Sequence, residues 1–336
     1  MKLHYATLFL AWSLNTIAAD FGKEIGELLQ KHRRSVAVVK DDDGGGSAFI
    51  AQIGKGKYLI TNQHVVAGHA NPTFTMPDRT LLKVGTAAAA FGHDIMSFGV
   101  EGDVTAIEAM QEVEKYAAIG DDVVVLGNPD AAGVIRPITG TIMGIGPQLV
   151  EVSAAFVAGN SGSPIVHVKS GKVIGVATYI TREERNLDEG RLAPTVRRFG
   201  YRLDSIKRWE PVRWWDYNDE FQTVEKIHKR SLELLAILTR LHEGKTTHPN
   251  AVQDPMIQAP LAKFAQSLRT IQTQQGYIEG AEEFVKGLKR ASFEDIDIAR
   301  RRVGYSFFLE RLVEEERLRA PIAEILDTVL KTKPGL

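Results

Sequence analysis

The sequence contains no cysteine, which excludes disulfide bonds, thiol catalysis and cysteine-ligated metals. It also lacks an excess of charge of either sign, because 41 Lys and Arg residues against 42 Asp and Glu residues give a formal net charge of −1. Nucleic-acid-binding proteins usually carry a strong basic excess, so this balance argues against a nucleic acid as partner. The 336 residues, of which 44% are hydrophobic, are enough for two domains with a sizeable core.

Long hydrophobic runs are scarce as well, and a short one stands near the N-terminus. A short basic start precedes an apolar stretch from Ala6 to Leu14, and the small residues Ala18 and Ala19 follow. This pattern is typical of a secretory signal peptide over residues 1–19, and the run is too short to span a bilayer. We therefore expect a periplasmic or secreted protein with no stable membrane span after cleavage. A buried or interfacial N-terminal helix is the alternative.

The pattern of the sequence changes twice after residue 20. Residues 20–34 have the apolar spacing of a short amphipathic helix. Residues 35–208 consist of short apolar runs separated by Gly, Asn, Asp and Pro, which predicts an all-β sandwich or barrel. We expect an aromatic-rich linker at residues 209–219 and a helical bundle at residues 220–336. Helices are predicted at 220–242, 260–289, 293–319 and 321–331.

The sequence leaves the role of the helical bundle open between restricting access to a site, forming a homo-oligomer and recognising a substrate. Upstream, an acidic turn at residues 41–46 lacks the alternating ligands of a calcium loop. Asp and Gly strongly favour turns in general. The sequence therefore indicates neither a metal nor any other cofactor.

A serine between two glycines stands in the β-rich region. Glycine tolerates backbone angles that other residues resist, so the turn from Gly159 to Gly162 can expose the hydroxyl of Ser161 and aim two backbone N–H groups into one small space. That geometry suits a nucleophile beside an oxyanion hole. Glycine- and serine-rich turns are also common between strands, so this motif alone does not decide.

A serine hydroxyl needs a positioned base, usually a histidine held by a carboxylate. Of nine histidines, His64 stands where an apolar strand ends and a polar turn begins. Asp94 directly precedes another apolar run, so its carboxylate is a candidate to orient the His64 ring. His93 is a competing base. A structural histidine and an ordinary turn aspartate are the alternatives for His64 and Asp94.

The order His64, Asp94, Ser161 resembles that of chymotrypsin-fold serine proteases. Within that fold, three segments resemble motifs of the bacterial HtrA/Deg proteases: Thr61–Val66, His93–Ile95 and Gly159–Pro164. The resemblance covers residues 35–208 and implies two six-stranded antiparallel β-barrels. It also implies peptide hydrolysis through an acyl-enzyme, with Ser161 as nucleophile, His64 as base and Asp94 orienting it. The backbone N–H groups of Gly159 and Ser161 are the implied oxyanion hole.

The resemblance also indicates which residues contact the P1 side chain, which precedes the cleaved bond. These residues are Ala155, Phe156, Val157, Val176, Ala177 and Thr178. None carries a carboxylate, so we expect a small or medium aliphatic P1 residue rather than Lys or Arg. The expected substrate is an unfolded or loosely structured protein segment that pairs with the strand edge at residues 176–180.

The chain departs from the family pattern in three places. A helical region stands where the family usually has PDZ domains, so cage assembly and PDZ-gated activation are not carried over. Ser153 stands where the family often has aspartate. Asn160 stands where zymogen-activated relatives have an aspartate that pairs with a newly cut N-terminus. Because an amide is neutral, activation through that ion pair is not expected.

Two other functions compete with proteolysis. The first is a catalytically weak protease fold that acts as a binding or scaffolding module through its helical domain. The second is an esterase of the α/β-hydrolase type, which also presents a serine between glycines. The residue two places after Ser161 is Ser163 instead of glycine, and the βα alternation of that fold is absent. The presence of His64, Asp94 and Ser161 weighs against the catalytically weak binding module.

Overall fold

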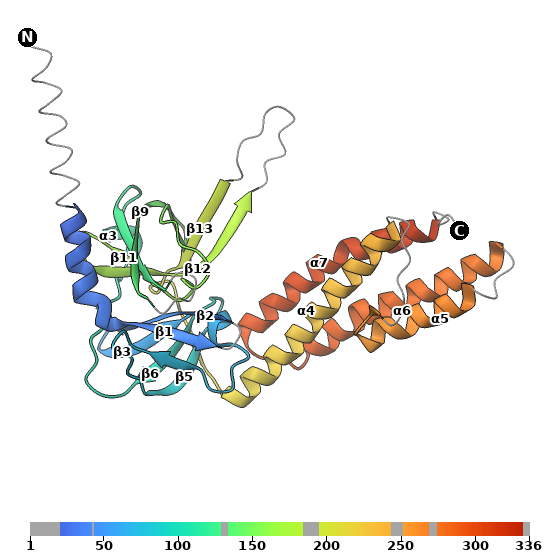
Figure 1. The fold of residues 1–336 in the computed structure, drawn as a ribbon, viewed down its shortest axis with the longest axis horizontal. Coiled ribbons are helices and arrows are strands. Elements are labelled where there is room, and N and C mark those ends of the chain that lie inside the picture. Colours follow the sequence, from blue (N-terminus) through green and yellow to red (C-terminus); the bar gives the residue numbers. More distant parts are fainter. Residues whose placement is uncertain are drawn as a thin grey trace, which may run out of the picture. The chain divides into compact units, whose positions relative to one another are not determined.

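The computed structural model describes residues 21–41, 44–128, 134–183, 195–242, 251–268 and 274–331. The chain divides into two compact units, Met1–Trp214 and Trp215–Leu336, one rich in strands and one helical (Figure 1). The expected signal peptide at residues 1–19 lies outside the described residues. The boundary between the units falls inside the predicted linker at 209–219, and this segment contains regular structure. Trp209–Pro211 forms strand β14, and helix α4 begins at Trp214.

The first sheet contains eight strands in the order β14-β5-β6-β3-β2-β1-β4, with β7 paired to β2. Their bounds are β1 Val36–Asp41, β2 Gly44–Ile53, β3 Gly56–Thr61, β4 Thr73–Thr75, β5 Val84–Ala90, β6 Met96–Val100, β7 Ile107–Glu108 and β14 Trp209–Pro211. The prediction of a closed six-stranded barrel is wrong for this half. Strand β4 has only three residues and bridges Leu81 instead of pairing with β5. At the other edge, Pro211 in β14 has no N–H to donate to a further strand.

The second sheet is a closed barrel in the order β10-β13-β12-β11-β8-β9, which confirms the prediction for this half. Its strands are β8 Asp122–Gly127, β9 Arg136–Ile145, β10 Leu149–Val152, β11 Pro164–His167, β12 Lys172–Glu183 and β13 Thr195–Tyr201. All of its pairs are antiparallel. Strands β12 and β13 reach beyond their neighbours in Figure 1. The pairing of β12 with β13 contains an irregularity between Ala177 and Tyr179, which sets the register of the strand that follows the serine motif.

Two apolar clusters hold this unit together. One fills the closed barrel and includes Val125, Ile142 and Ile165. The other contains residues of both sheets, such as Phe49 and Val166, together with the N-terminal helix. That helix comprises residues 21–32, followed by a 3₁₀ turn at Arg33–Ser35. Because its apolar side is buried, the helix belongs to the β-rich unit.

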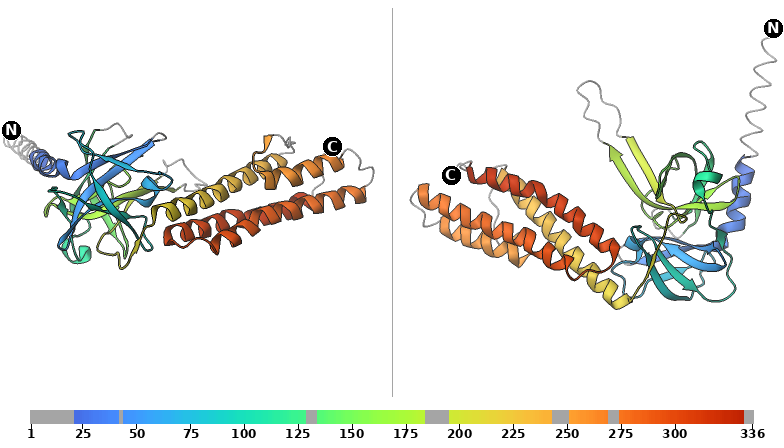
Figure 2. Two further views of the ribbon diagram at one scale, coloured as in Figure 1. Left: turned by 90° about the horizontal axis from the view of Figure 1, so that it is seen from below. Right: turned by 180° about the vertical axis from the view of Figure 1, so that it is seen from behind.

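The second unit consists of helices α4 Trp214–His242, α5 Pro255–Leu268, α6 Gln274–Arg300 and α7 Ser306–Lys331, which run alongside one another (Figure 2). The predicted helix breaks are misplaced. The predicted helix at 260–289 is divided between α5 and α6, and the chain stays helical where an end near 289 was expected. The α6–α7 break falls at Gly304 and Tyr305, whose N–H groups donate to the carboxylate of Glu220 in α4. No described helix has the length and hydropathy of a membrane span.

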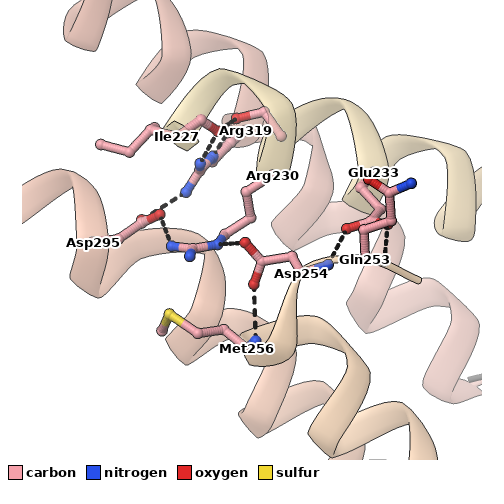
Figure 3. A network of polar contacts seen from close by, with 9 residues as sticks. Ile227, Arg230, Glu233, Gln253, Asp254, Met256, Asp295 and Arg319 are labelled. Carbon is pink, nitrogen blue, oxygen red and sulfur yellow. Dashed lines mark hydrogen bonds and ion pairs between the residues drawn. The ribbon is translucent and has the colours of Figure 1, made fainter. Parts of the chain in front are cut away.

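A polar network joins the helices of this unit (Figure 3). Arg230 in α4 donates to Asp254, before α5, at 2.8 Å and also pairs with Asp295 in α6. Arg319 in α7, whose side chain is 0% exposed, donates to the other oxygen of Asp295 at 2.8 Å and to the carbonyl oxygen of Ile227 at 2.8 Å. Asp295 thus bridges two buried guanidinium groups, and with Asp254 it balances their charge. Breaking a buried ion pair costs more than a surface pair because it leaves an uncompensated charge.

Asp295→Ala is expected to lower the free energy of unfolding of the helical unit by about 3–5 kcal/mol, because the buried Arg319 then lacks the carboxylate it pairs with and Arg230 keeps only Asp254. The matched control is Glu294→Ala, which removes an exposed pair with Arg290 and is expected to cost about 0.5 kcal/mol or less. Urea unfolding followed by far-ultraviolet circular dichroism measures both. Equal costs for the two variants would contradict this account of the network.

The N-terminal helix supplies a second prediction, at His32. Burial, followed by the charge of Lys31, lowers the pKa of His32 from 6.5 to about 4. As the pH falls below about 6.5, the unfolded chain binds a proton here that the folded chain does not bind until about pH 4. The free energy of unfolding therefore decreases across this window. In His32→Leu the decrease from pH 7 to pH 4 should be smaller than in the wild type, as measured by urea unfolding at each pH. An identical pH dependence would refute this.

Candidate active site

His64 lies on a single helical turn, α2 Gln63–Val66, directly after strand β3. Its two predecessors tie this turn to the loop before β6. The side-chain amide of Asn62 donates to the carbonyl oxygen of Asp94 at 2.7 Å, and that of Gln63 donates to the carbonyl oxygen of His93 at 2.8 Å. Both amide side chains are buried. They therefore hold the end of β3 and the aspartate loop together and place His64 next to Asp94.

The carboxylate of Asp94 contacts His64 twice. Nδ1 of the ring lies 2.5 Å from Oδ2 of Asp94, and the backbone N–H of His64 donates to Oδ1 at 3.0 Å. The Asp94 side chain is 14% exposed and the ring 37% exposed. A carboxylate on Nδ1 favours the tautomer that carries its proton there, which leaves Nε2 as the proton acceptor. Asp94 and His64 are thus in direct contact through both the ring and the backbone of the histidine.

His93, the competing base, lies in the core instead. Its Nδ1 contacts the carbonyl oxygen of Phe91 at 2.9 Å, and its Nε2 contacts Oγ of Ser205 at 2.8 Å. Burial lowers its pKa, which favours the neutral ring. With both nitrogens engaged inside the protein, His93 is a structural residue.

The segment around Ser161 forms two consecutive turns. The N–H of Asn160 donates to the carbonyl oxygen of Val157 at 3.1 Å, and the N–H of Ser163 donates to that of Asn160 at 2.9 Å. The third residue of each turn is a glycine, with φ of 85° at Gly159 and 86° at Gly162. A type II turn requires a positive φ at this position. The two glycines of the motif therefore supply the positive φ angles that the two turns require, and Ser161 lies between them.

The predicted oxyanion donors are available in this double turn. Among the described residues, the N–H groups of Gly159 and Ser161 have no hydrogen-bond partner, whereas those of Asn160, Gly162 and Ser163 do. Unsatisfied backbone N–H groups are uncommon where the chain is folded. Two of them, on either side of one residue, can accept a negatively charged oxygen.

Ser47 in β2 fastens this turn to the first sheet. Its N–H donates to the carbonyl oxygen of Ser161 at 2.8 Å, and its hydroxyl donates to that of Gly159 at 3.0 Å. The same hydroxyl accepts the N–H of Asn128, after β8, at 3.1 Å. A Cβ atom on Gly162 would lie 1.9 Å from the carbonyl oxygen of Ser47. Only glycine permits this approach. The contact between the turn and β2 therefore requires a glycine at position 162.

The Ser161 hydroxyl is half-buried, and its hydrogen bond among the described residues goes to the carbonyl oxygen of Thr178 at 3.5 Å instead of to the His64 ring. The two segments are nevertheless neighbours. A Cβ atom on Gly46 would lie 2.7 Å from a methyl group of Val65 and 3.1 Å from the carbonyl oxygen of Ser161. The structure thus joins His64 to Asp94 directly and brings the Ser161 backbone beside the histidine turn.

The predicted P1 pocket residues fall into two groups. The side chains of Phe156, Val176 and Ala177 pack into the two apolar clusters, so they do not form an open pocket wall. Ala155 and Val157 are exposed, and the Thr178 hydroxyl accepts a hydrogen bond from Asn62 at 2.9 Å. The region before Ser161 therefore presents mainly backbone and two small apolar side chains.

Sequence reasoning missed two contributors to the site, Ser47 and Arg198. Ser47 stands in an ordinary Gly-Gly-Ser run, and its importance depends on sheet contacts far along the chain. Arg198 in β13 donates from Nε to the carbonyl oxygen of Phe156 at 2.9 Å. Its position follows from the pairing of β13 with β12, which the sequence does not specify.

Residues 46–176 match the family model of the trypsin-like peptidase domain. No curated protein matches the chain. Three solved structures are among those to which the chain is similar. The serine endoprotease from Yersinia pestis is 22% identical with a TM-score of 0.40, and the match covers 46% of this chain and 57% of that one.

The HtrA-type protease AlgW with tripeptide is 20% identical with a TM-score of 0.41, covering 54% of this chain and 60% of that one. An inactive form of Rv3671c from M. tuberculosis H37Rv is 19% identical with a TM-score of 0.40, covering 53% and 86%. The chain thus spans less than two thirds of the first two structures. The match of residues 46–176 to the trypsin-like peptidase domain model agrees with the resemblance seen in the sequence.

Proposed function

We propose that this protein is a serine endopeptidase in which Ser161 is the nucleophile, His64 the general base and Asp94 the residue that orients it. The observation that carries the proposal is the Asp94–His64 pair, at 2.5 Å, beside a turn whose Gly159 and Ser161 N–H groups have no partner among the described residues. A base, an orienting carboxylate and two oxyanion donors are the groups that acyl transfer from an amide requires.

In the first half of the reaction, Oγ of Ser161 attacks the carbonyl carbon of the substrate while its proton moves to Nε2 of His64. The carbonyl oxygen becomes negatively charged and accepts the N–H groups of Gly159 and Ser161. The C–N bond then breaks, and the proton on Nε2 passes to the departing amine. In the second half, a water molecule repeats the attack on the acyl-enzyme ester, and the proton returns through His64 to Ser161.

The proposal requires the Ser161 hydroxyl to turn from the Thr178 carbonyl, which it contacts at 3.5 Å, to Nε2 of His64. A hydrogen bond at 3.5 Å is weak. Breaking it to rotate the Ser161 hydroxyl therefore costs little free energy. Catalytic hydrogen bonds are often long or poorly aligned before substrate binds. The long contact to Thr178 is therefore compatible with the proposed role.

The proposed substrate is an extended segment of an unfolded or loosely structured protein. Strand β12 pairs with β11 only as far as Val176, and beyond this point its recorded partner among the described strands is β13. The free edge at residues 178–180 begins at the carbonyl that contacts Ser161. A substrate strand added there places its backbone beside the nucleophile. The proposal includes export, which rests on the sequence of residues 1–19 alone.

A fluorophosphonate probe tests the nucleophile. The full-length protein should be labelled, Ser161→Ala should lose labelling, and the control Ser153→Ala, at an exposed serine, should keep it. Asp94→Asn is expected to reduce turnover of a casein substrate about 10⁴-fold, because the neutral amide no longer holds the required tautomer. A folded wild-type protein that neither reacts with the probe nor cleaves casein would overturn the proposal and favour the binding or scaffolding alternative.

Ser47→Ala is expected to lower kcat about fivefold, because one hydrogen bond that fixes the Gly159 carbonyl is lost and such a bond contributes about 1 kcal/mol. The KM value should change little. The control is Ser97→Ala, which removes another buried hydroxyl bonded to a backbone carbonyl, that of Ala88, far from the serine turn in the strand order. Equal kcat values for the two variants would contradict the role given to Ser47.

A further inference from the structure

Arg198 occupies an unusual position in the closed barrel. It lies in β13, where its backbone pairs with Ile180 of β12 on one side and with Val152 of β10 on the other. Its Nε donates to the carbonyl oxygen of Phe156 at 2.9 Å, and the residue is half-buried. The side chain thus reaches from one strand of the barrel wall to the segment that leads into the serine turn.

The neighbouring arginine shows what is distinctive about Arg198. Arg197 binds both oxygens of Glu151, at 2.9 and 2.7 Å, and its guanidinium lies 4.9 Å from the ring centre of Phe199. Successive residues of a strand face opposite sides, so Arg198 points away from this pair. Among the described residues, the two terminal amino groups of Arg198 make no hydrogen bond or ion pair. A half-buried positive charge with two unused donors is an incomplete site.

Arg198 contacts both segments that lead to and from the proposed nucleophile. Phe156, whose carbonyl Arg198 holds, belongs to the segment immediately before the serine turn. Ile180, its partner in β12, is two residues beyond Thr178, whose carbonyl contacts the Ser161 hydroxyl. Arg198 therefore connects the two segments that flank Ser161, through its backbone on the β12 side and through its guanidinium on the Phe156 side. In the proposed function, a substrate strand along the β12 edge would direct its P1 side chain between these same segments.

We propose that Arg198 determines specificity by binding the carboxylate of a Glu or Asp side chain at P1. The inference rests on the proposed function, cleavage of peptide bonds by Ser161. A guanidinium with two free amino groups matches a carboxylate in a two-point contact, and partial burial strengthens this attraction relative to an exposed pair. A basic P1 side chain is repelled, and an aliphatic one leaves the guanidinium without a partner.

This inference competes with the small aliphatic P1 residue expected from the sequence. That expectation considered residues 155–157 and 176–178, which carry no charge. Arg198 lies outside both segments and enters the region through the pairing of β13. The two views agree that Lys and Arg are disfavoured, and they differ on whether a carboxylate is preferred over a methyl or isopropyl group.

The test uses fluorogenic peptides that differ only at P1, carrying Glu, Asp, Gln, Ala, Val or Lys. The peptides of this first set have amidated C-termini. In a second set, the only carboxylate is the free C-terminus of the peptide. The wild type should cleave the Glu or Asp peptide with a kcat/KM about 10- to 100-fold above the Gln peptide, as expected for a charge-assisted two-point contact. The preference should decrease as salt is added. A preference only for the free C-terminus would contradict a P1 side-chain site.

Variants separate specificity from a structural role of Arg198. Arg198→Gln should lose the distinction between Glu and Gln while still cleaving the Ala peptide, Arg198→Lys should keep part of it, and Arg198→Glu should favour the Lys peptide. The matched control is Arg197→Gln on the opposite face of the same strand, which should leave the P1 preference unchanged. An uncharged fluorophosphonate reports whether the serine turn of each variant is intact, because it does not use the P1 charge.

The failure of this inference differs from the failure of the proposed function. If the wild type is labelled at Ser161 but prefers Ala or Val at P1, and Arg198→Gln has the same profile, the Arg198 assignment is wrong and the protease assignment stands. If a folded wild type is neither labelled nor active on any peptide, both are wrong. Loss of cleavage of all peptides in every Arg198 variant, including Arg198→Lys, would assign the residue a structural role.

Discussion

The contact between Ser47 and the serine turn is the constraint on which the β-rich unit depends. Ser47 belongs to the open sheet, Ser161 to the turn before β11 of the closed barrel, and His64 to the end of β3 in the open sheet. The histidine and the serine thus come from different sheets, and their separation is set by how the sheets meet. The hydrogen bonds of Ser47 to Ser161, Gly159 and Asn128 fix that meeting.

The contact is buried and uses nearly every polar group of Ser47. Besides the bonds made by its N–H and hydroxyl, its carbonyl oxygen accepts the hydroxyl of Thr61 at 2.8 Å. Thr61 is the last residue of β3, three residues before His64. A buried polar group without a partner is costly, so displacement of the turn would leave several groups unsatisfied together. The network therefore resists small shifts of Ser161 relative to His64, which is the precision that proton transfer requires.

Local chemistry made much of the site predictable. Gly159 and Gly162 signal positive φ because few other residues adopt it, and the polar residues after β3 and before β6 mark strand ends. Register and distant partners were not predictable. The reach of Arg198 depends on an irregularity between Ala177 and Tyr179 in a neighbouring strand. The open first sheet depends on a three-residue β4, and the α6–α7 break depends on Glu220 in another helix. Such features arise from contacts between distant segments, whereas sequence patterns report local preference.

A structure of the protein after reaction with a fluorophosphonate measures the central geometry most directly. The account predicts phosphorus bonded to Oγ of Ser161, with one phosphoryl oxygen about 2.7–3.1 Å from the N–H groups of both Gly159 and Ser161 and with Nε2 of His64 facing the modified oxygen. The Ser47 contacts should be unchanged from the free protein. An adduct whose phosphoryl oxygen points away from both N–H groups, or whose His64 ring has left Asp94, would contradict it.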